Sequence, residues 1–227
     1  MYKISLLFIA IALSSVSFAQ QHTDSLGKIP PIRPNPPVPV EVFAGNNYLN
    51  FQMIVSKPFK QGSRFGFFNV TNFNGNYDNN LRKNEFLTQG LVNFEVYKGI
   101  SLAVGATMNY VTGFRPTAGL QYLFGNREWL VVLLPRIDLR DDYNFETFGL
   151  VEYKPQLTKT LGLYTRVQGL YNHNTKQEFH DRSYLYFRAG LSYQNYQFGL
   201  GANFDRYGPM KVSGDNFGLF VRVLLNN

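Results

Sequence analysis

The sequence has no cysteine, little charge and no long apolar run beyond its N-terminus. Without cysteine, the 227-residue chain can form neither a disulfide nor a thiolate metal site. Only 16% of its residues are charged, against roughly 25% in soluble domains. Beyond the N-terminal segment, no stretch approaches the roughly 18 consecutive apolar residues that indicate a transmembrane helix. These absences exclude a disulfide scaffold and a helical membrane protein.

The chain is basic, but its basic residues do not form a patch. The formal net charge is +7, from 22 Lys and Arg against 15 Asp and Glu, and these residues are spread along the sequence. Nucleic-acid-binding domains concentrate such charge on one face or in one run. We therefore expect no nucleic-acid partner. Aromatic residues are frequent, with 21 Phe and 15 Tyr, and supply large side chains for an apolar surface.

From about Leu49 to Leu225, apolar and polar residues alternate with a period of two. Leu185, Phe187 and Leu191, for example, share one face of a strand, and Arg188 lies on the other. Most alternating segments have the length that a tilted strand needs to cross a bilayer. The strands are predicted at residues 41–45, 47–57, 63–73, 84–97, 100–111, 113–124, 127–139, 143–156, 161–173, 182–193, 196–205 and 216–225. The predicted fold is all-β, a single transmembrane antiparallel up-and-down β-barrel of about twelve strands.

The connections agree with a barrel whose two ends differ. Tight turns are predicted at residues 98–99, 125–126 and 194–195, which contain Gly or Asn, residues that tolerate a positive φ. Longer polar connections are predicted at residues 74–83, 173–181 and 206–215. Short turns at one end and longer loops at the other are typical of outer-membrane barrels. A count of ten strands would follow if the first strand and one neighbour were misassigned.

The N-terminus predicts export. Lys3 is followed by an apolar segment, residues 4–13, and then by Ser17 and Ala19, which fit a small-x-small cleavage site. The apolar segment is too short to span a bilayer. We interpret residues 1–19 as a signal peptide that is cleaved after Ala19, so that the mature chain is exported.

Residues 20–40 differ in composition from the rest of the chain. Six of the eleven positions from Ile29 to Pro39 are proline. Proline offers no N–H group to a β-ladder and favours the extended polyproline II conformation. We therefore predict a Pro-rich periplasmic leader at residues 20–40 and a barrel at residues 41–227. The leader is interpreted as a spacer, with a ligand for a periplasmic partner as the alternative.

The polar face of the predicted strands collects the charged side chains, which we place inside the barrel. No charge falls mid-strand on the outer face, where Arg or Lys would cost roughly 2–4 kcal/mol. The strand register sets Arg136 opposite Glu146 and Glu152 opposite Arg166, and we predict that both are inward-facing cross-strand ion pairs. The candidate lumen-lining residues are Arg115, Arg136, Glu146, Glu152, Arg166, Arg188 and Arg222. They would form either a charged constriction that selects a solute or a network that fills a narrow barrel.

A histidine and a serine lie close together and invite comparison with lipid hydrolases of the outer membrane. The spacing of His180 and Ser183 matches no known hydrolase pattern, and no G-x-S-x-G motif occurs. Ser183 also has the parity of the outer face. Asp138, Asp141 and Asp142 lack the spacing of a calcium loop. We therefore predict no catalytic residue, no metal site, no cofactor and no enzyme activity.

The last predicted strand resembles the signal that outer-membrane barrels present to their insertion machinery. The polar Asn216 is followed by Gly218 and then by the hydrophobic Val221 and Val223, although the chain lacks the common terminal aromatic residue. Over its length the sequence resembles small porin-like outer-membrane β-barrel proteins of Gram-negative bacteria. The resemblance implies a location in the bacterial outer membrane, among outer-membrane lipids and lipopolysaccharide. It also implies that residues 216–225 are recognised by the barrel insertion machinery.

These observations predict a narrow porin-like channel for the passive passage of small polar solutes. Inward-facing arginines would favour anions. The alternative is a non-conducting structural or adhesion barrel, whose lumen is filled and whose loops or leader bind a partner. A lipid-modifying barrel enzyme is a third interpretation. The sequence leaves the solute and the oligomeric state open.

Overall fold

The computed structural model describes residues 35–78, 83–141 and 143–226. The signal peptide predicted at residues 1–19 and most of the predicted leader therefore lie outside the described residues. No helix in the described ranges is long and apolar enough to cross a membrane. The strands are β1 (Val38–Gly45), β2 (Tyr48–Pro58), β3 (Phe65–Asn76), β4 (Glu85–Tyr97), β5 (Ile100–Asn109), β6 (Gly113–Gly125), β7 (Trp129–Asp138), β8 (Asn144–Tyr153), β9 (Leu161–Asn174), β10 (Phe179–Tyr193), β11 (Tyr196–Tyr207), β12 (Val212–Ser213) and β13 (Asn216–Leu225).

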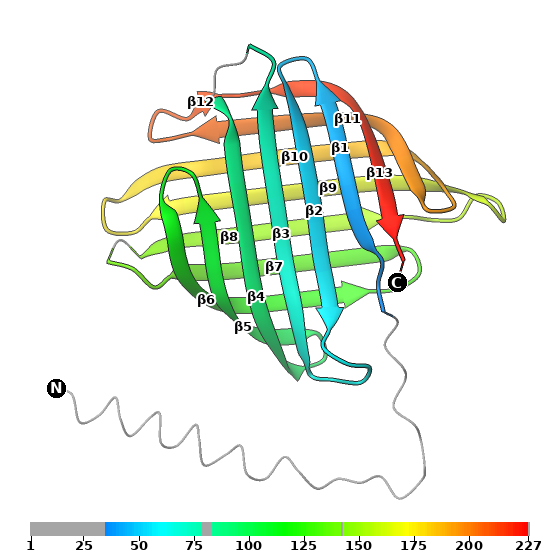
Figure 1. The fold of residues 1–227 in the computed structure, drawn as a ribbon, viewed down its shortest axis with the longest axis horizontal. Coiled ribbons are helices and arrows are strands. Elements are labelled where there is room, and N and C mark those ends of the chain that lie inside the picture. Colours follow the sequence, from blue (N-terminus) through cyan, green and yellow to red (C-terminus); the bar gives the residue numbers. More distant parts are fainter. Residues whose placement is uncertain (1–34, 79–82, 142, 227) are drawn as a thin grey trace, which may run out of the picture. The chain divides into compact units, whose positions relative to one another are not determined.

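Twelve of these strands close into an antiparallel barrel, as predicted (Figure 1). Strands β1 to β11 each pair with the next along the chain, β11 pairs with β13, and β13 pairs with β1. The two-residue strand β12 is an addition to the end of β11 and does not belong to the ring. Because every strand of the ring has two neighbours, the barrel has no open edge.

The first strand begins earlier than predicted. Strand β1 starts at Val38, so residues 38–40 belong to the barrel and not to the leader. Pro39 is tolerated because it lies near the beginning of the strand, where β1 is paired with β13 but not yet with β2. The pairing with β2 begins one residue later, at Val40.

Two connections also differ from the prediction. The loop expected at residues 173–181 is a short connection of residues 175–178, because β9 extends to Asn174 and β10 begins at Phe179. The turn expected at residues 125–126 lies slightly later, where the side-chain oxygen of Asn126 accepts hydrogen bonds from the N–H groups of Glu128 and Trp129. The tight turn at residues 98–99 is confirmed, with both residues at positive φ.

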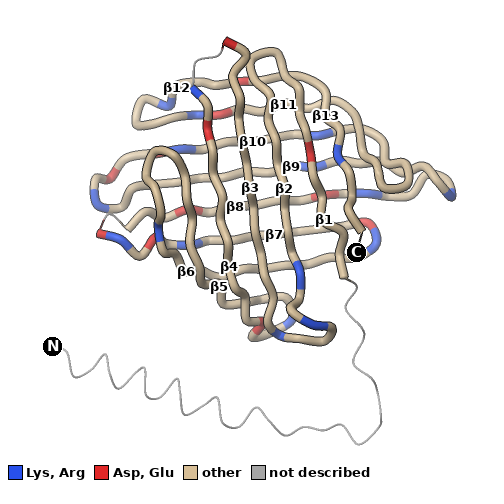
Figure 2. Tube along the Cα trace, in the orientation of Figure 1, with Lys and Arg blue, Asp and Glu red and all other residues tan. Residues whose placement is uncertain are grey.

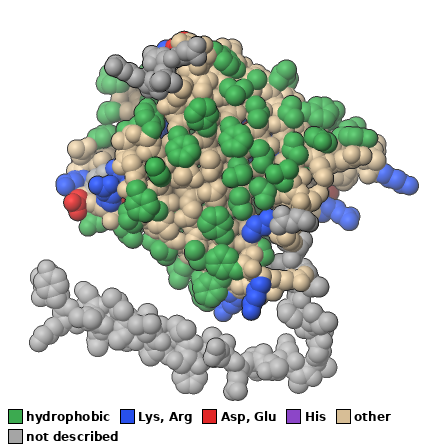
Figure 3. Space-filling model, viewed as in Figure 1, with side chains coloured by type: hydrophobic (Ala, Val, Ile, Leu, Met, Phe, Trp, Pro, Cys, Tyr) green, Lys and Arg blue, Asp and Glu red, His purple; other side chains and the backbone are tan. Residues whose placement is uncertain are grey.

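The outer wall is apolar, as the alternation predicted. Val92, Leu102, Val104, Leu120 and Leu133 are each between 45% and 58% exposed. Figure 3 shows such side chains spread over the visible face, with charged groups near its margins. A barrel that pairs all its strands and exposes apolar side chains meets both requirements of a hydrocarbon environment. The fold is that of a transmembrane β-barrel.

The inner face is less polar than expected. Phe68, Leu91, Leu134 and Phe148 belong to an apolar cluster from β3, β4, β5, β7 and β8 that is almost inaccessible to solvent. The assignment of strand faces from the alternation was correct, since Leu134 shares the inner face of β7 with Arg136. However, alternation alone does not require that every inward residue is polar. The middle of this side of the interior is therefore filled with hydrocarbon.

Gly218 tests the closure of the barrel. It pairs with Gly45 where β1 meets β13, and a Cβ atom at Gly218 would collide with the carbonyl oxygen of Ala44. Gly218→Ala should destabilise the folded barrel by about 1–3 kcal/mol, measured as an earlier heat-induced shift on gels. Gly149→Ala is the control, since its Cβ would meet only Leu133 Cδ1, at 3.9 Å. Equal stability of the two variants would contradict a tight seam.

Candidate functional site in the barrel interior

All seven residues predicted to line the lumen are buried inside the barrel. None of them is more than 8% exposed. They fall into two groups that lie in different parts of the interior. One group surrounds Glu41 and Glu152, and the other surrounds Arg136.

Glu41 joins two of the predicted arginines. Its Oε1 atom accepts a hydrogen bond from Arg166 Nη2 at 2.7 Å and another from Arg188 Nε at 2.9 Å. Arg166 also donates to Gln52, and the Arg188 guanidinium lies 4.1 Å from the centroid of the Phe43 ring. Charges this deeply buried are tolerated only when they are paired and hydrogen-bonded. Glu41 therefore holds the centre of the polar interior together.

Glu152 forms the second half of this centre. Its carboxylate pairs with Arg222 at 2.5 Å and with Lys154 at 3.1 Å, and it accepts a hydrogen bond from the Tyr164 hydroxyl. The predicted register is confirmed, since Glu152 lies opposite Arg166 on the adjacent strand. The predicted ion pair is not formed, however, because Arg166 turns to Glu41 instead. We call Glu41, Glu152, Arg166, Arg188 and Arg222 the central ion network.

The second group lies towards the loop end of β7 and β8. Arg136 pairs with Glu146 at 2.7 Å, as the register predicted, and with Asp138 at 2.5 Å. Arg115 lies 3.4 Å from Asp138. Thr117 accepts a further hydrogen bond from Arg136. We call Arg115, Arg136, Asp138 and Glu146 the loop-side ion network.

Glu41 is the functional candidate that sequence reasoning missed. It begins the predicted first strand, which was too short to define an inner and an outer face. The closed barrel provides the missing signal, since Glu41 lies opposite Arg222 across the β1–β13 seam. Figure 2 shows this as an acidic segment of β1 beside a basic segment of β13. The inward arginines are thus matched by more carboxylates than the sequence indicated.

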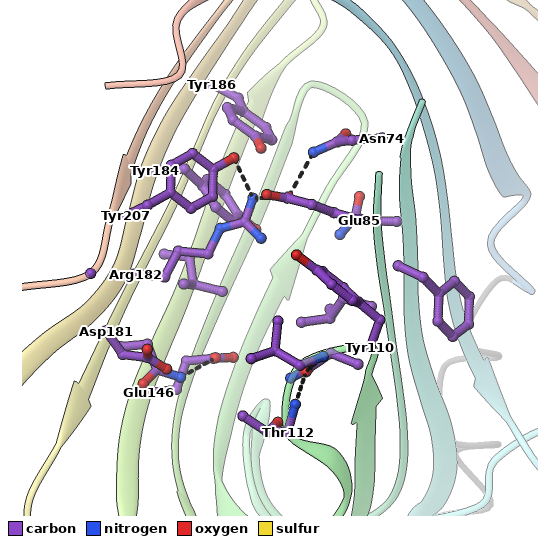
Figure 4. Close-up of a pocket in the computed structure, with 18 residues that line it drawn as sticks. Asn74, Glu85, Tyr110, Thr112, Glu146, Asp181, Arg182, Tyr184, Tyr186 and Tyr207 are labelled. Atoms are coloured by element: carbon purple, nitrogen blue, oxygen red, sulfur yellow. Dashed lines mark hydrogen bonds and ion pairs between the residues drawn. The ribbon is translucent and has the colours of Figure 1, made fainter. Parts of the chain in front are cut away.

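A cavity of about 250 Å³ opens at the loop end of the barrel, and we call it the vestibule. Its wall combines carboxylate, tyrosine and amide side chains. Across it, Arg182 of β10 reaches Glu85 of β4 at 2.8 Å. Figure 4 shows this pair meeting from opposite walls, with Tyr110 and Thr112 on the side away from Asp181. The wall also includes aliphatic side chains such as Leu87 and Leu170, so the vestibule combines charged and amide groups with apolar and aromatic ones.

His180 and Ser183 are in contact, although the sequence spacing suggested no catalytic pair. A register shift between β9 and β10 lies at this point, and His180 Nε2 is 2.9 Å from Ser183 Oγ. The other ring nitrogen lies 2.8 Å from the carbonyl oxygen of Gly208, so Nδ1 carries the proton and Nε2 accepts from the serine. Within the described ranges no carboxylate is hydrogen-bonded to the ring. The hydrogen bond from His180 to Gly208 fixes the connection after β11 to the barrel wall.

The same connection is fixed at its other end. Arg206 donates to the carboxylate of Asp215 at 2.6 Å. This hydrogen bond lowers the pKa of Asp215 below its usual range. Because the pKa is lowered, the carboxylate stays charged and the contact persists in mildly acidic solution. Both ends of the connection at the mouth of the vestibule are thus tied to the barrel.

Comparison with known proteins gives structural similarity alone. No protein-family model and no curated protein matches the sequence. The NanC porin is 10% identical, with 84% of this chain and 100% of that chain covered and a TM-score of 0.49. The KdgM porin is 11% identical, with 83% and 99% covered and a TM-score of 0.43. OccK7 of Pseudomonas aeruginosa is 10% identical, with 79% and 68% covered and a TM-score of 0.40.

Proposed function

We propose that the protein is a porin-like channel of the bacterial outer membrane for small polar solutes. Solutes would enter the vestibule from the loop side and pass the central ion network, which forms the constriction. The observation that carries the proposal is a cavity with charged and amide side chains in its wall, at one mouth of a barrel whose outer wall is apolar. Outer-membrane lipids and lipopolysaccharide would contact that wall, and the insertion machinery would recognise β13. No catalytic residue is part of the proposal.

The constriction is closed in this conformation. Glu41, Arg166 and Arg188 are at most 2% exposed, so no space for water surrounds them. Passage of a solute therefore requires these side chains to move. We expect the wild-type channel to open rarely and to carry little current.

The charge of the constriction favours anions. The central ion network contains three arginines, Arg166, Arg188 and Arg222, against the two carboxylates of Glu41 and Glu152. Fixed positive charge raises the local concentration of anions, and a confined bore preserves that bias in moderate salt. The positive surplus of the interior is small, because the arginines outside the central ion network are paired with carboxylates of their own, as Arg136 is with Glu146. We expect a weak preference for anions.

Arg188→Ala should increase the conductance of the refolded barrel in planar bilayers. Arg166 would still pair with Glu41, so the change removes bulk from the constriction without stranding the carboxylate. We expect single-channel openings at least about twofold larger than wild type, with a reversal potential closer to zero in a salt gradient. Arg127→Ala, in an exposed turn, is the control that alters charge away from the constriction.

A second candidate is the non-conducting barrel with a filled lumen. The apolar cluster of β3–β8 favours it, because hydrocarbon inside the barrel leaves no path for ions on that side. This candidate predicts no steady conductance from the wild type or from Arg188→Ala. Silent bilayers for both proteins, with folding verified by heat modifiability, would replace the channel with a structural or adhesion barrel.

A further inference from the structure

Two cavities adjoin at the loop-side mouth of the barrel. The vestibule and a second cavity of about 280 Å³ share Thr112 in their linings. We call the second cavity the rim pocket, and its lining residues are Thr112, Arg115, Arg140, Asp141, Asn174, Lys176 and Gln177. The two cavities differ in charge, and a ligand of moderate size could occupy both at once.

The vestibule supplies an available negative charge. The carboxylate of Asp181 lines it and forms no hydrogen bond or ion pair with any residue that the structure describes. The other charged groups of the wall have partners, since Glu85 pairs with Arg182 and Glu146 pairs with Arg136. Asp181 is thus the one acidic group of the vestibule, among the described residues, that an incoming cation could pair with directly.

The rim pocket supplies available positive charge. Its lining holds three basic residues against the single carboxylate of Asp141, and neither Arg140 nor Lys176 forms an ion pair with a carboxylate in the described part of the chain. Arg140 uses one nitrogen, Nη1, to donate to the backbone carbonyl of Phe114. Its other guanidinium nitrogens form no hydrogen bond with the residues that the structure describes. Guanidinium and ammonium groups are the usual protein ligands of carboxylates.

We propose that the mouth of the barrel binds a zwitterionic solute of the amino-acid class. Its ammonium group would pair with Asp181 and its carboxylate with Arg140 and Lys176. Tyr110 and Leu170 of the vestibule would contact its apolar part. The combined size of the cavities suits a small solute. The proposal rests on the proposed channel function only in naming the solute that it would admit.

The opposite charges explain why a single ion fits less well. A simple cation would pair with Asp181 but leave Arg140 and Lys176 without a counterion. A simple anion would occupy the rim pocket and face Asp181 across Thr112. Only a solute with both charges satisfies both cavities.

Isothermal titration calorimetry of the full, detergent-refolded barrel tests the proposal with three matched probes. L-Phenylalanine carries both charges, 2-phenylethylamine only the ammonium and 3-phenylpropionate only the carboxylate. We expect L-phenylalanine to bind about tenfold or more tightly than either single-charge probe, since each charged hydrogen bond contributes to affinity. Equal affinity for all three, or heat from none of them, would overturn the proposal.

Variants identify which group holds which charge. Asp181→Asn should weaken binding of L-phenylalanine and 2-phenylethylamine but not that of 3-phenylpropionate, which no longer faces a like charge. Arg140→Gln combined with Lys176→Gln should weaken binding of L-phenylalanine and 3-phenylpropionate but not that of 2-phenylethylamine. Lys159→Gln, in a turn at the opposite end of the barrel, removes a positive charge as a control and should change nothing. If the vestibule and rim variants bind like the control, the assignment is wrong.

The binding test is independent of the channel. Binding that follows the predicted pattern in a protein with silent bilayers would disprove the channel but keep the site. Ion conductance without binding of L-phenylalanine would keep the channel and disprove the site. Folding of every variant is checked by its heat-induced gel shift.

Discussion

Glu41→Gln should lower the free energy of unfolding of the barrel by about 3–5 kcal/mol, the cost of removing one partner from a buried ion pair. Arg166 and Arg188 both donate to the same oxygen of Glu41. The amide of glutamine keeps the size of the side chain but leaves two buried guanidinium groups facing each other without a carboxylate. Their mutual repulsion adds to the cost of their burial. Urea-induced unfolding in detergent micelles measures the change.

Glu128→Gln provides the comparison for this variant. Glu128 lies exposed in the turn between β6 and β7, where water solvates the charge. Surface charges of this kind contribute between zero and about 1 kcal/mol. Unfolding midpoints that coincide for the two variants would show that water reaches Glu41 and screens its arginines.

The sequence predicted the barrel well because one physical signal governs it. Alternation with a period of two identifies both the strands and their faces. It correctly set Arg136 opposite Glu146 and Glu152 opposite Arg166. Each of these pairs joins strands that are neighbours along the chain, so a short turn fixes their register.

Interactions between strands distant along the chain were not predictable in the same way. Glu41 meets Arg166 and Arg188 across the interior of the barrel, from β1 to β9 and β10. Alternation gives the direction of each side chain but not how far it reaches or which partner it selects. Glu152 illustrates the limit, since its neighbour Arg166 was predicted as the partner and Arg222 is the partner observed.

The filling of the interior was the second feature that the pattern concealed. Leu134 and Phe148 face inward, and the alternation assigns such positions to the inner face without predicting whether the residue is polar or apolar. A lipid-facing surface forbids charge, whereas an interior face accepts either charged or apolar side chains if they pack. The outer wall could therefore be predicted residue by residue, but the composition of the lumen could not.

The second large loss of stability is expected in the loop-side ion network. Arg136→Leu should destabilise the barrel by about 3–5 kcal/mol, because it leaves Glu146 and Asp138 buried without their shared cation. Arg136 Nε and Nη2 both contact Glu146 Oε1, at 3.1 and 2.7 Å, and Nη1 contacts Asp138. Arg136→Lys should recover part of the loss, since an ammonium keeps the charge but cannot make both contacts in the same geometry.

The double variant Arg136→Leu/Glu146→Leu decides whether the cost arises from the pair itself. Removing both charges abolishes the stranded carboxylate, and Asp138 retains Arg115 at 3.4 Å. We therefore expect the double variant to be more stable than Arg136→Leu alone, a non-additivity that reports direct contact between the two residues. Urea unfolding of the four proteins of this cycle measures it. If the losses of unfolding free energy in the two single variants simply add, Arg136 and Glu146 contribute independently, and the prediction of a direct interaction between them is wrong.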